Sequence, residues 1–402
     1  ETKIDGNISS VGFNCYTYTN IITHGNFKKK LFSGSASIDD PNIKIDTLTG
    51  SLNFSKSDPE FNLNANVGRL NLKNLGFTND SISLTGNFNL DFTGSNIDNF
   101  LGSAKLYNAI LLDNEKHLSF DSLIINSTVA NGKKYLTLET NEIEATLNGN
   151  FKILELPDAF QLFLNKYYPA YINKPRRKIE NQNFTFLVKT KNVSDYIALI
   201  NKKISGLYNS IFIGNINVAE NTLNIHADIP QFNFSNISFN NIHFTGRGTS
   251  DTLTFNGNID DVIINDSLHA PCTIIQVIAN NDVSDLTVNT SANKTLNAAN
   301  LSARIQTKKD GFQLRFNPSS FAINGKKWSI EQGGELELNK NMLMASNIKF
   351  SQNGQQILVS TEPSAIGSSN DLVVGLNNLV IGDFTPFFTK EVKLNGFMSG
   401  NV

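Results

Sequence analysis

The sequence is poor in cysteine, tryptophan, proline and charge, and it has no long apolar run. Cys15 and Cys272 are the only cysteines in 402 residues, so they do not fix a redox compartment, and a disulfide between them stays an open possibility. No apolar run approaches the ~18 residues that cross a bilayer as a helix. The net charge is -2, and nothing in the sequence indicates the concentrated basic surface that binding to nucleic acid requires.

Motifs for catalysis are also missing. The five histidines have no zinc-like spacing. The carboxylate pairs Asp39–Asp40 and Asp260–Asp261 are adjacent in sequence, whereas glycoside hydrolysis needs two carboxylates placed across a cleft. Gly246-Arg-Gly248 lacks the glycine spacing of a phosphate loop, and no Gly-x-Ser-x-Gly elbow is present. The sequence therefore predicts a protein that is not an enzyme and that needs no metal and no cofactor.

Strict alternation of apolar and polar residues is the strongest signal. Hydrophobic residues make up 40% of the chain and charged residues only 17%, so the polar positions are mainly Asn, Ser and Thr. Period-two alternation puts the apolar side chains of a strand on one side of a sheet and the polar ones in water. The residues predicted to line one shared apolar face are Phe61, Leu63, Val67, Ile82, Leu84, Phe88, Leu90, Phe92, Leu136, Leu138, Leu223, Ile225, Ile229, Leu253, Phe255, Phe312, Leu314, Phe316, Leu336, Leu338, Leu372, Val374 and Leu376.

Turn-forming pairs fall where these strands end. Asn131-Gly132, Asn324-Gly325 and Asn353-Gly354 suit tight hairpins because both central positions tolerate positive φ. We therefore predict an all-β fold, a long curled antiparallel meander that forms an open β-groove, with a few short helices. Two sheets packed face to face are the alternative, in which the apolar face is simply a core. A sandwich of this length would normally divide into several compact domains, yet no linker interrupts the sequence.

Helical spacing is confined to the middle of the chain. Residues 156–168 have Pro157 in a first turn and apolar residues three and four apart. Ser194 is predicted to cap a second helix that carries Ile197, Ile200 and Ile204. We therefore expect one continuous groove over residues 1–402, with a helical insertion at about 156–204 and no domain boundary.

The basic cluster Arg176, Arg177 and Lys178 lies between the two predicted helices. Such a cluster can contact anionic lipid headgroups, at ~1 kcal/mol for each residue near a charged surface. A solvated loop between helices is the simpler interpretation.

Several stretches carry a likeness to a known family. These stretches are Ser81–Leu106, Phe244–Leu253, Phe321–Trp328, Gly334–Leu338 and Leu379–Phe384. Their alternating strands and glycine turns resemble the TamB-like members of the AsmA superfamily, in the version found in Bacteroidetes-type bacteria. The shared motifs are packing and turn patterns rather than catalytic ones.

The resemblance implies a long periplasmic protein that is anchored in the inner membrane, reaches the outer membrane, and includes this chain as one segment. It implies that the open groove binds phospholipid acyl chains and carries phospholipids between the two membranes. It also implies a link to an outer-membrane barrel protein of the Omp85 type, through parts of the parent chain that are not present here. The alternatives are a scaffold for outer-membrane protein assembly and an inert structural or adhesin-like segment.

Overall fold

The computed structural model is almost entirely β-structure. Within the described residues, strands account for 69% and helices for 7%, and 28 antiparallel strands belong to a sheet that is not closed. The prediction of an all-β antiparallel fold with a few short helices is thus confirmed. The structure describes residues 2–13, 15–79, 81–113, 116–179, 182–201, 203–265, 268–291, 296–339, 342–364, 370–388 and 394–402.

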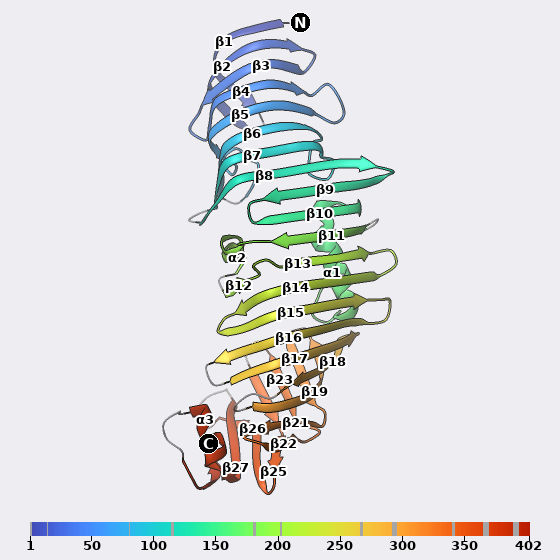
Figure 1. The fold of residues 1–402 in the computed structure, drawn as a ribbon. Helices are drawn as coiled ribbons and strands as arrows, with labels where there is room; N and C mark the ends of the chain where they lie inside the picture. Colours follow the sequence, from blue (N-terminus) through green and yellow to red (C-terminus); the bar gives the residue numbers. More distant parts are fainter. Residues whose placement is uncertain are drawn as a thin grey trace. The chain divides into compact units, whose positions relative to one another are not determined.

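The chain folds as two compact units (Figure 1). The first contains Glu1–Leu154 and Phe184–Lys202, and the second contains Glu155–Asn183 and Lys203–Val402. The chain therefore enters the second unit, returns to the first, and enters the second again. The expectation of one continuous groove over 1–402 stays a prediction.

The first unit is a meander in which strands β1 to β10 each pair with the next in antiparallel fashion. The turn Asn131-Gly132 between β8 and β9 has positive φ at both residues, as the hairpin prediction requires. The strands are β1 (Thr2–Phe13), β2 (Tyr16–Lys28), β3 (Leu31–Asp39), β4 (Ile43–Asn53), β5 (Glu60–Asn71), β6 (Ile82–Thr93), β7 (Leu101–Asp113), β8 (Lys116–Ala130), β9 (Lys133–Thr140), β10 (Ile143–Asn150) and β11 (Asn183–Thr190).

The second unit is a meander that divides into two branches at β19. One half of β19 pairs with β20, which leads to β23 and β24, and the other half pairs with β21, which leads through β22, β25, β26 and β27 to β28. The strands are β12 (Ile204–Gly206), β13 (Ile211–Asn217), β14 (Thr222–Phe234), β15 (Ile237–Gly248), β16 (Leu253–Asn265), β17 (Leu268–Asn280), β18 (Val283–Thr290), β19 (Leu296–Lys308), β20 (Gly311–Phe316), β21 (Ser319–Ile323), β22 (Lys326–Ile330), β23 (Glu335–Asn339), β24 (Met342–Ser346), β25 (Ile348–Gln352), β26 (Gln355–Pro363), β27 (Asn370–Val380) and β28 (Phe397–Asn401).

The helices follow the predicted positions in part. A 3₁₀ turn, η1 (Ile153–Glu155), leads into α1 (Leu156–Tyr167), which confirms the helix predicted over 156–168. The second predicted helix is shorter than expected. It is α2 (Ser194–Ile200), whereas Ile204 lies in strand β12. A third helix, α3 (Ile381–Phe388), follows β27.

The prediction that Ser194 caps α2 is wrong. Ser194 is the first helical residue, and Val193 occupies the cap position without a side-chain hydrogen bond. The Ser194 hydroxyl instead donates to Asn192 Oδ1 at 2.7 Å. The hydroxyl is therefore engaged with a residue that lies two positions before it, outside the helix.

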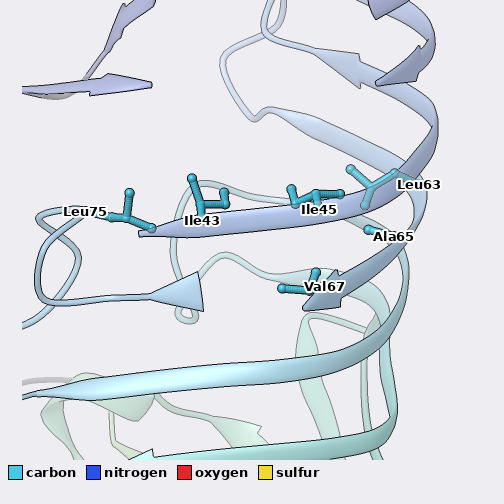
Figure 2. Packing of buried hydrophobic residues seen from close by; sticks show 6 residues of the cluster. All are labelled: Ile43, Ile45, Leu63, Ala65, Val67 and Leu75. Atoms are coloured by element: carbon cyan, nitrogen blue, oxygen red, sulfur yellow. The ribbon is translucent and has the colours of Figure 1, made fainter. Parts of the chain in front are cut away.

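Buried apolar side chains of the first unit gather on the inner side of the bent strands β4 and β5 (Figure 2). Leu75, from the turn after β5, is fully buried against this cluster. The cluster consists of Ile43, Ile45, Leu63, Ala65, Val67 and Leu75. The core of this unit thus lies on the face that alternation predicted to be apolar.

Candidate functional site

Strand register in the first unit joins the predicted apolar residues into continuous rows. Residues paired directly across neighbouring strands lie on the same face of a sheet. One such row, which we call the first lane, crosses all ten strands from β1 to β10. It consists of Ile4, Gly25, Gly34, Gly50, Leu63, Leu90, Ala104, Ile125, Leu138 and Ala145.

Most predicted face residues of this unit remain partly accessible. Leu63, Val67 and Leu136 are buried. The others are half-buried, namely Phe61, Ile82, Leu84, Phe88, Leu90, Phe92 and Leu138. Much of the apolar face is therefore partly accessible, although its side chains also pack on one another, as the stacked rings of Phe61 and Phe92 do at 4.6 Å between centroids.

The opposite face of the same strands is a ladder of amides. Asn66 Nδ2 donates to Asn87 Oδ1 at 2.7 Å, and Asn89 Nδ2 donates to Asn64 Oδ1 at 2.6 Å. All four side chains belong to exposed hydrogen-bonded pairs between β5 and β6. This face suits contact with water, so each of these strands has one apolar and one hydrated side.

A β-bulge extends the apolar face beyond what alternation predicts. The register of β5 shifts between Val67 and Leu70, and after the shift Leu70 pairs with Leu84 of β6. Leu70 therefore joins the apolar face, although its position in sequence has the opposite parity to Leu63. Bulges leave no clear mark in a single sequence, so alternation alone missed this residue.

The second unit has a corresponding row, which we call the second lane. It consists of Leu223, Gly248, Leu253, Ala279, Ser284, Ile305, Leu314, Leu336 and Ala345. Of the predicted face residues in this unit, Leu223 and Leu253 are buried, whereas Leu338 and Leu372 are exposed. The half-buried ones are Ile225, Ile229, Phe255, Phe312, Leu314, Phe316, Leu336, Val374 and Leu376.

Helix α1 lies across part of the second lane (Figure 1). Phe163 is buried against Gly248, and Leu253 and Ala279 are fully buried. The Tyr167 hydroxyl donates a hydrogen bond to the carbonyl oxygen of Thr249. Burial raises the pKa of Tyr167 to about 12. Alternation could not reveal this contact, because it joins residues that lie some eighty positions apart.

An apolar pocket of about 870 Å³ opens beside the C-terminal end of α1. Its volume lies within the ~300–1,000 Å³ typical of ligand pockets. Phe312 and Leu338, both predicted to line the apolar face, line this pocket. The other lining residues are Leu164, Tyr168, Tyr171, Ile172, Val277, Ser284, Ile305, Thr307, Lys309, Asp310, Gly311 and Asn339.

Hydrogen bonds fix the wall of this pocket to the turn between β17 and β18. The Asp282 amide donates to the carbonyl of Tyr167 at 2.6 Å, and the Ala170 amide donates to Asp282 Oδ1 at 2.9 Å. The Tyr168 hydroxyl and Ser284 Oγ lie 3.1 Å apart. The segment that follows α1 is therefore held over the sheet by both backbone and side-chain bonds.

The predicted basic cluster is exposed and lies outside the residues that line the pocket. Arg177 forms an ion pair with Asp158 in the first turn of α1. Arg176 and Lys178 are exposed as well. The charged residues at the pocket are instead Lys309 and Asp310. Headgroup contact through the basic cluster stays a prediction.

Helix α3 covers another part of the apolar side of the second unit. Trp328 is fully buried, and the ring of Phe384 on α3 packs edge-on against it at 5.5 Å between centroids. Trp328 forms a buried cluster with Ile323 and Leu379, and Leu376, which was predicted to line the apolar face, packs against this cluster. Lys326 Nζ lies 2.7 Å from Asp383 Oδ2, which holds α3 to β22.

These features define an antiparallel β-sheet protein with a partly accessible apolar face and an apolar pocket beside a helix. No family model matches the chain, and neither do curated proteins or solved structures. None of the helices in the described parts of the chain has the length and apolar character to cross a membrane. Cys15 and Cys272 are both free and exposed. The resemblance to TamB-like proteins stays a prediction.

Proposed function

We propose that this chain binds phospholipid acyl chains on its apolar face and forms a segment of a periplasmic conduit between the inner and outer membranes. One observation carries the proposal, namely that apolar side chains stay in register from β5 to β10 in the first unit. These residues are Leu63, Leu90, Ala104, Ile125, Leu138 and Ala145. The amide ladder on the opposite side of the same strands supports it, because it would keep the outer surface hydrated. The resemblance of Ser81–Leu106 to TamB-like proteins agrees with this function.

The energetic role of the face is to keep acyl chains out of water. Burial of one CH₂ group is worth ~0.8 kcal/mol. Exposing to water two acyl chains that together contain roughly 30 methylenes therefore costs on the order of 24 kcal/mol. A continuous row of Leu, Ile and Ala side chains removes much of that cost. Because neighbouring positions such as Leu63 and Leu90 are chemically alike, a bound chain can move between strands without a chemical step.

The test compares two adjacent residues of β6 that point to opposite faces. Phe88 lies on the apolar face and Asn87 on the amide ladder. We expect Phe88→Glu to lower the amount of phospholipid that copurifies with the chain, because a carboxylate on this face cannot be solvated by alkyl groups. Asn87→Glu should leave lipid content unchanged. Native mass spectrometry and lipid extraction measure both.

Two results would overturn the proposal. The first is a purified chain that carries no lipid and takes none up from vesicles of phosphatidylethanolamine and phosphatidylglycerol. The second is an equal loss of lipid in both variants, at unchanged circular dichroism and thermal midpoint. A lipid-free chain that binds unfolded outer-membrane proteins would favour the assembly scaffold instead.

A further inference from the structure

We infer that the pocket beside the C-terminal end of α1 is a discrete site that holds one acyl chain of a zwitterionic phospholipid. This inference rests on the proposed function, because it assigns one place on the apolar face where a lipid is retained. It differs from that function in predicting a single saturable site rather than uniform binding along the strands.

The second lane is covered by side chains of α1 in one part and lines the open pocket in the next. The boundary between these two parts is where we locate the site. Under α1 the lane consists of small or fully buried residues, and Phe163 and Tyr167 occupy the space over Gly248. Beyond Ser284 the lane reaches Ile305, which lines the pocket. An acyl chain that follows the sheet toward α1 therefore finds room in the pocket and a filled lane beyond it.

The lining of the pocket indicates an alkyl ligand. Leu164 on α1 and Ile172 in the segment after it form one side, and Val277, Ile305 and Phe312 form the sheet side. Aliphatic side chains on both sides suit a flexible saturated chain, whose burial gains ~0.8 kcal/mol for each CH₂ group. Thr307 and Asn339 bring hydrogen-bonding groups to the same pocket, so a polar head can remain at its margin.

The charges at the pocket indicate the class of head. Lys309 and Asp310 are adjacent in the turn between β19 and β20, and both line the pocket. Their neighbour Lys308 forms an ion pair with Glu337 at 2.8 Å, whereas neither Lys309 nor Asp310 is paired with another of the described residues. One cation beside one anion matches a head that carries a phosphate and an ammonium group, through charge-assisted hydrogen bonds.

The bonds from α1 to the β17–β18 turn give the pocket a fixed wall. Asp282 accepts a hydrogen bond from the Ala170 amide and donates one to the Tyr167 carbonyl. The Tyr168 hydroxyl also forms a hydrogen bond with Ser284 on β18. A chain in the pocket would have to break this set of bonds to continue under the helix, which makes the pocket a place of retention.

The test uses the whole chain and a phosphatidylethanolamine that carries one fluorescent acyl chain. Val277 lines the pocket, and its neighbour Ile278 projects from the opposite face of β17 with 41% of its surface exposed. We expect the unmodified chain to show one saturable site. Val277→Glu should weaken binding about tenfold or more, because an unpaired carboxylate enters the apolar pocket. Ile278→Glu should bind like the unmodified chain.

Two further variants keep the test decisive. Leu338→Asn changes a pocket residue that is 40% exposed, so it should fold even if Val277→Glu does not, and it should also weaken binding. Lys309→Gln should weaken binding of the phosphatidylethanolamine severalfold and leave binding of a diacylglycerol with the same acyl chains unchanged.

The outcomes separate this inference from the proposed function. If Phe88→Glu lowers lipid content but the pocket variants bind the probe normally, the retention site is wrong and the conduit stands. Binding that never saturates at one probe per chain leads to the same conclusion. If the unmodified chain binds no lipid at all, the conduit is wrong and the site falls with it.

Discussion

The ring of Phe163 on α1 lies against the backbone of Gly248 on β15. A Cβ atom added to Gly248 would stand 2.2 Å from Cζ of Phe163 and 3.1 Å from the hydroxyl of Tyr167. Glycine is needed at this position because the helix comes so close to the strand. The contact therefore determines whether α1 can occupy the second lane.

Substitution of Gly248 by valine should displace α1. Overpacking at this contact costs ~1–3 kcal/mol, and the buried ring of Phe163 must move to relieve it, which weakens the docking of α1 on the sheet. We expect faster amide hydrogen exchange in Leu156–Tyr167 with little change in the strands of the first unit. Gly257→Val is the matched control, because a Cβ at Gly257 meets no atom within 4 Å. Unchanged exchange in α1 of the Gly248 variant would contradict this account.

The close pairing of Gly25 and Gly34 gives a second prediction. A Cβ on Gly34 would lie 2.1 Å from the carbonyl oxygen of His24 and 2.6 Å from the Cα of Gly25. These are backbone atoms and cannot move aside, so Gly34→Ala should destabilise the first unit by ~1–3 kcal/mol in urea unfolding. Gly12→Ala, which meets nothing within 4 Å, should have no such effect.

Asp40 should make the stability of the first unit sensitive to acid. Burial alone would raise the pKa of its carboxyl, but hydrogen bonds from Tyr16, Asn42 and Thr19 outweigh burial and lower this pKa below its usual value. The Tyr16 hydroxyl donates at 2.5 Å, and the Thr19 amide donates at 3.0 Å. A carboxyl whose pKa is lower in the folded chain stabilises the fold above its unfolded pKa, and that contribution is lost as pH falls through the folded pKa.

The Asp40→Asn variant checks this acid dependence. We expect a loss of ~1.5–3 kcal/mol in the free energy of unfolding at pH 7, since the charge-assisted bonds are weakened. The difference from the unmodified chain should shrink as pH falls below ~4, where the unfolded carboxyl is protonated. Asp39→Asn, at an exposed neighbour, is the control. A difference that stays constant from pH 7 to acid would show that ionisation of Asp40 plays no part.

Two tyrosines, the buried Tyr167 and the half-buried Tyr196, should titrate late at alkaline pH. Burial raises the pKa of Tyr167 and of Tyr196 to about 12 each. A tyrosine whose pKa is higher in the folded chain stabilises the fold below its unfolded value of ~10, and this contribution disappears as pH rises toward the folded pKa. Tyrosinate absorbance should therefore show a late step that Tyr167→Phe reduces. If Tyr167 titrates near the ordinary tyrosine value of ~10, its burial against Gly248 is not maintained.

Alternation and turn chemistry predicted the fold class because they act over short distances in sequence. The pairing of Leu138 with Ala145 follows from regular strands joined by a tight turn. The helix over 156–168 was predictable for the same reason, since its apolar spacing and Pro157 are local signals. The end of α2 was not, because Ile204 keeps a helical spacing but pairs with Phe234 of β14.

The candidate pocket could be predicted only in part. Phe312 and Leu338 were identified from the parity of their own strands. Tyr168, Val277 and Ile305 were not, because their convergence depends on where α1 docks on a sheet that is formed much later in the chain. The bulge that brings Leu70 onto the apolar face, and the role of α3 in covering Leu376, are likewise products of tertiary packing.

The position of α1 in the sequence sets the order in which the second unit can be completed. The helix ends at Tyr167, but the residues that it contacts include Gly248 and Asp282, which are made after β11 and α2 of the first unit. During synthesis the partner strands of this amphipathic helix are therefore not yet present, so its apolar side stays exposed. Chaperones recognise exposed apolar surface of this kind. A chain truncated between α1 and β14 would keep that surface permanently, and would aggregate more readily than one truncated before η1.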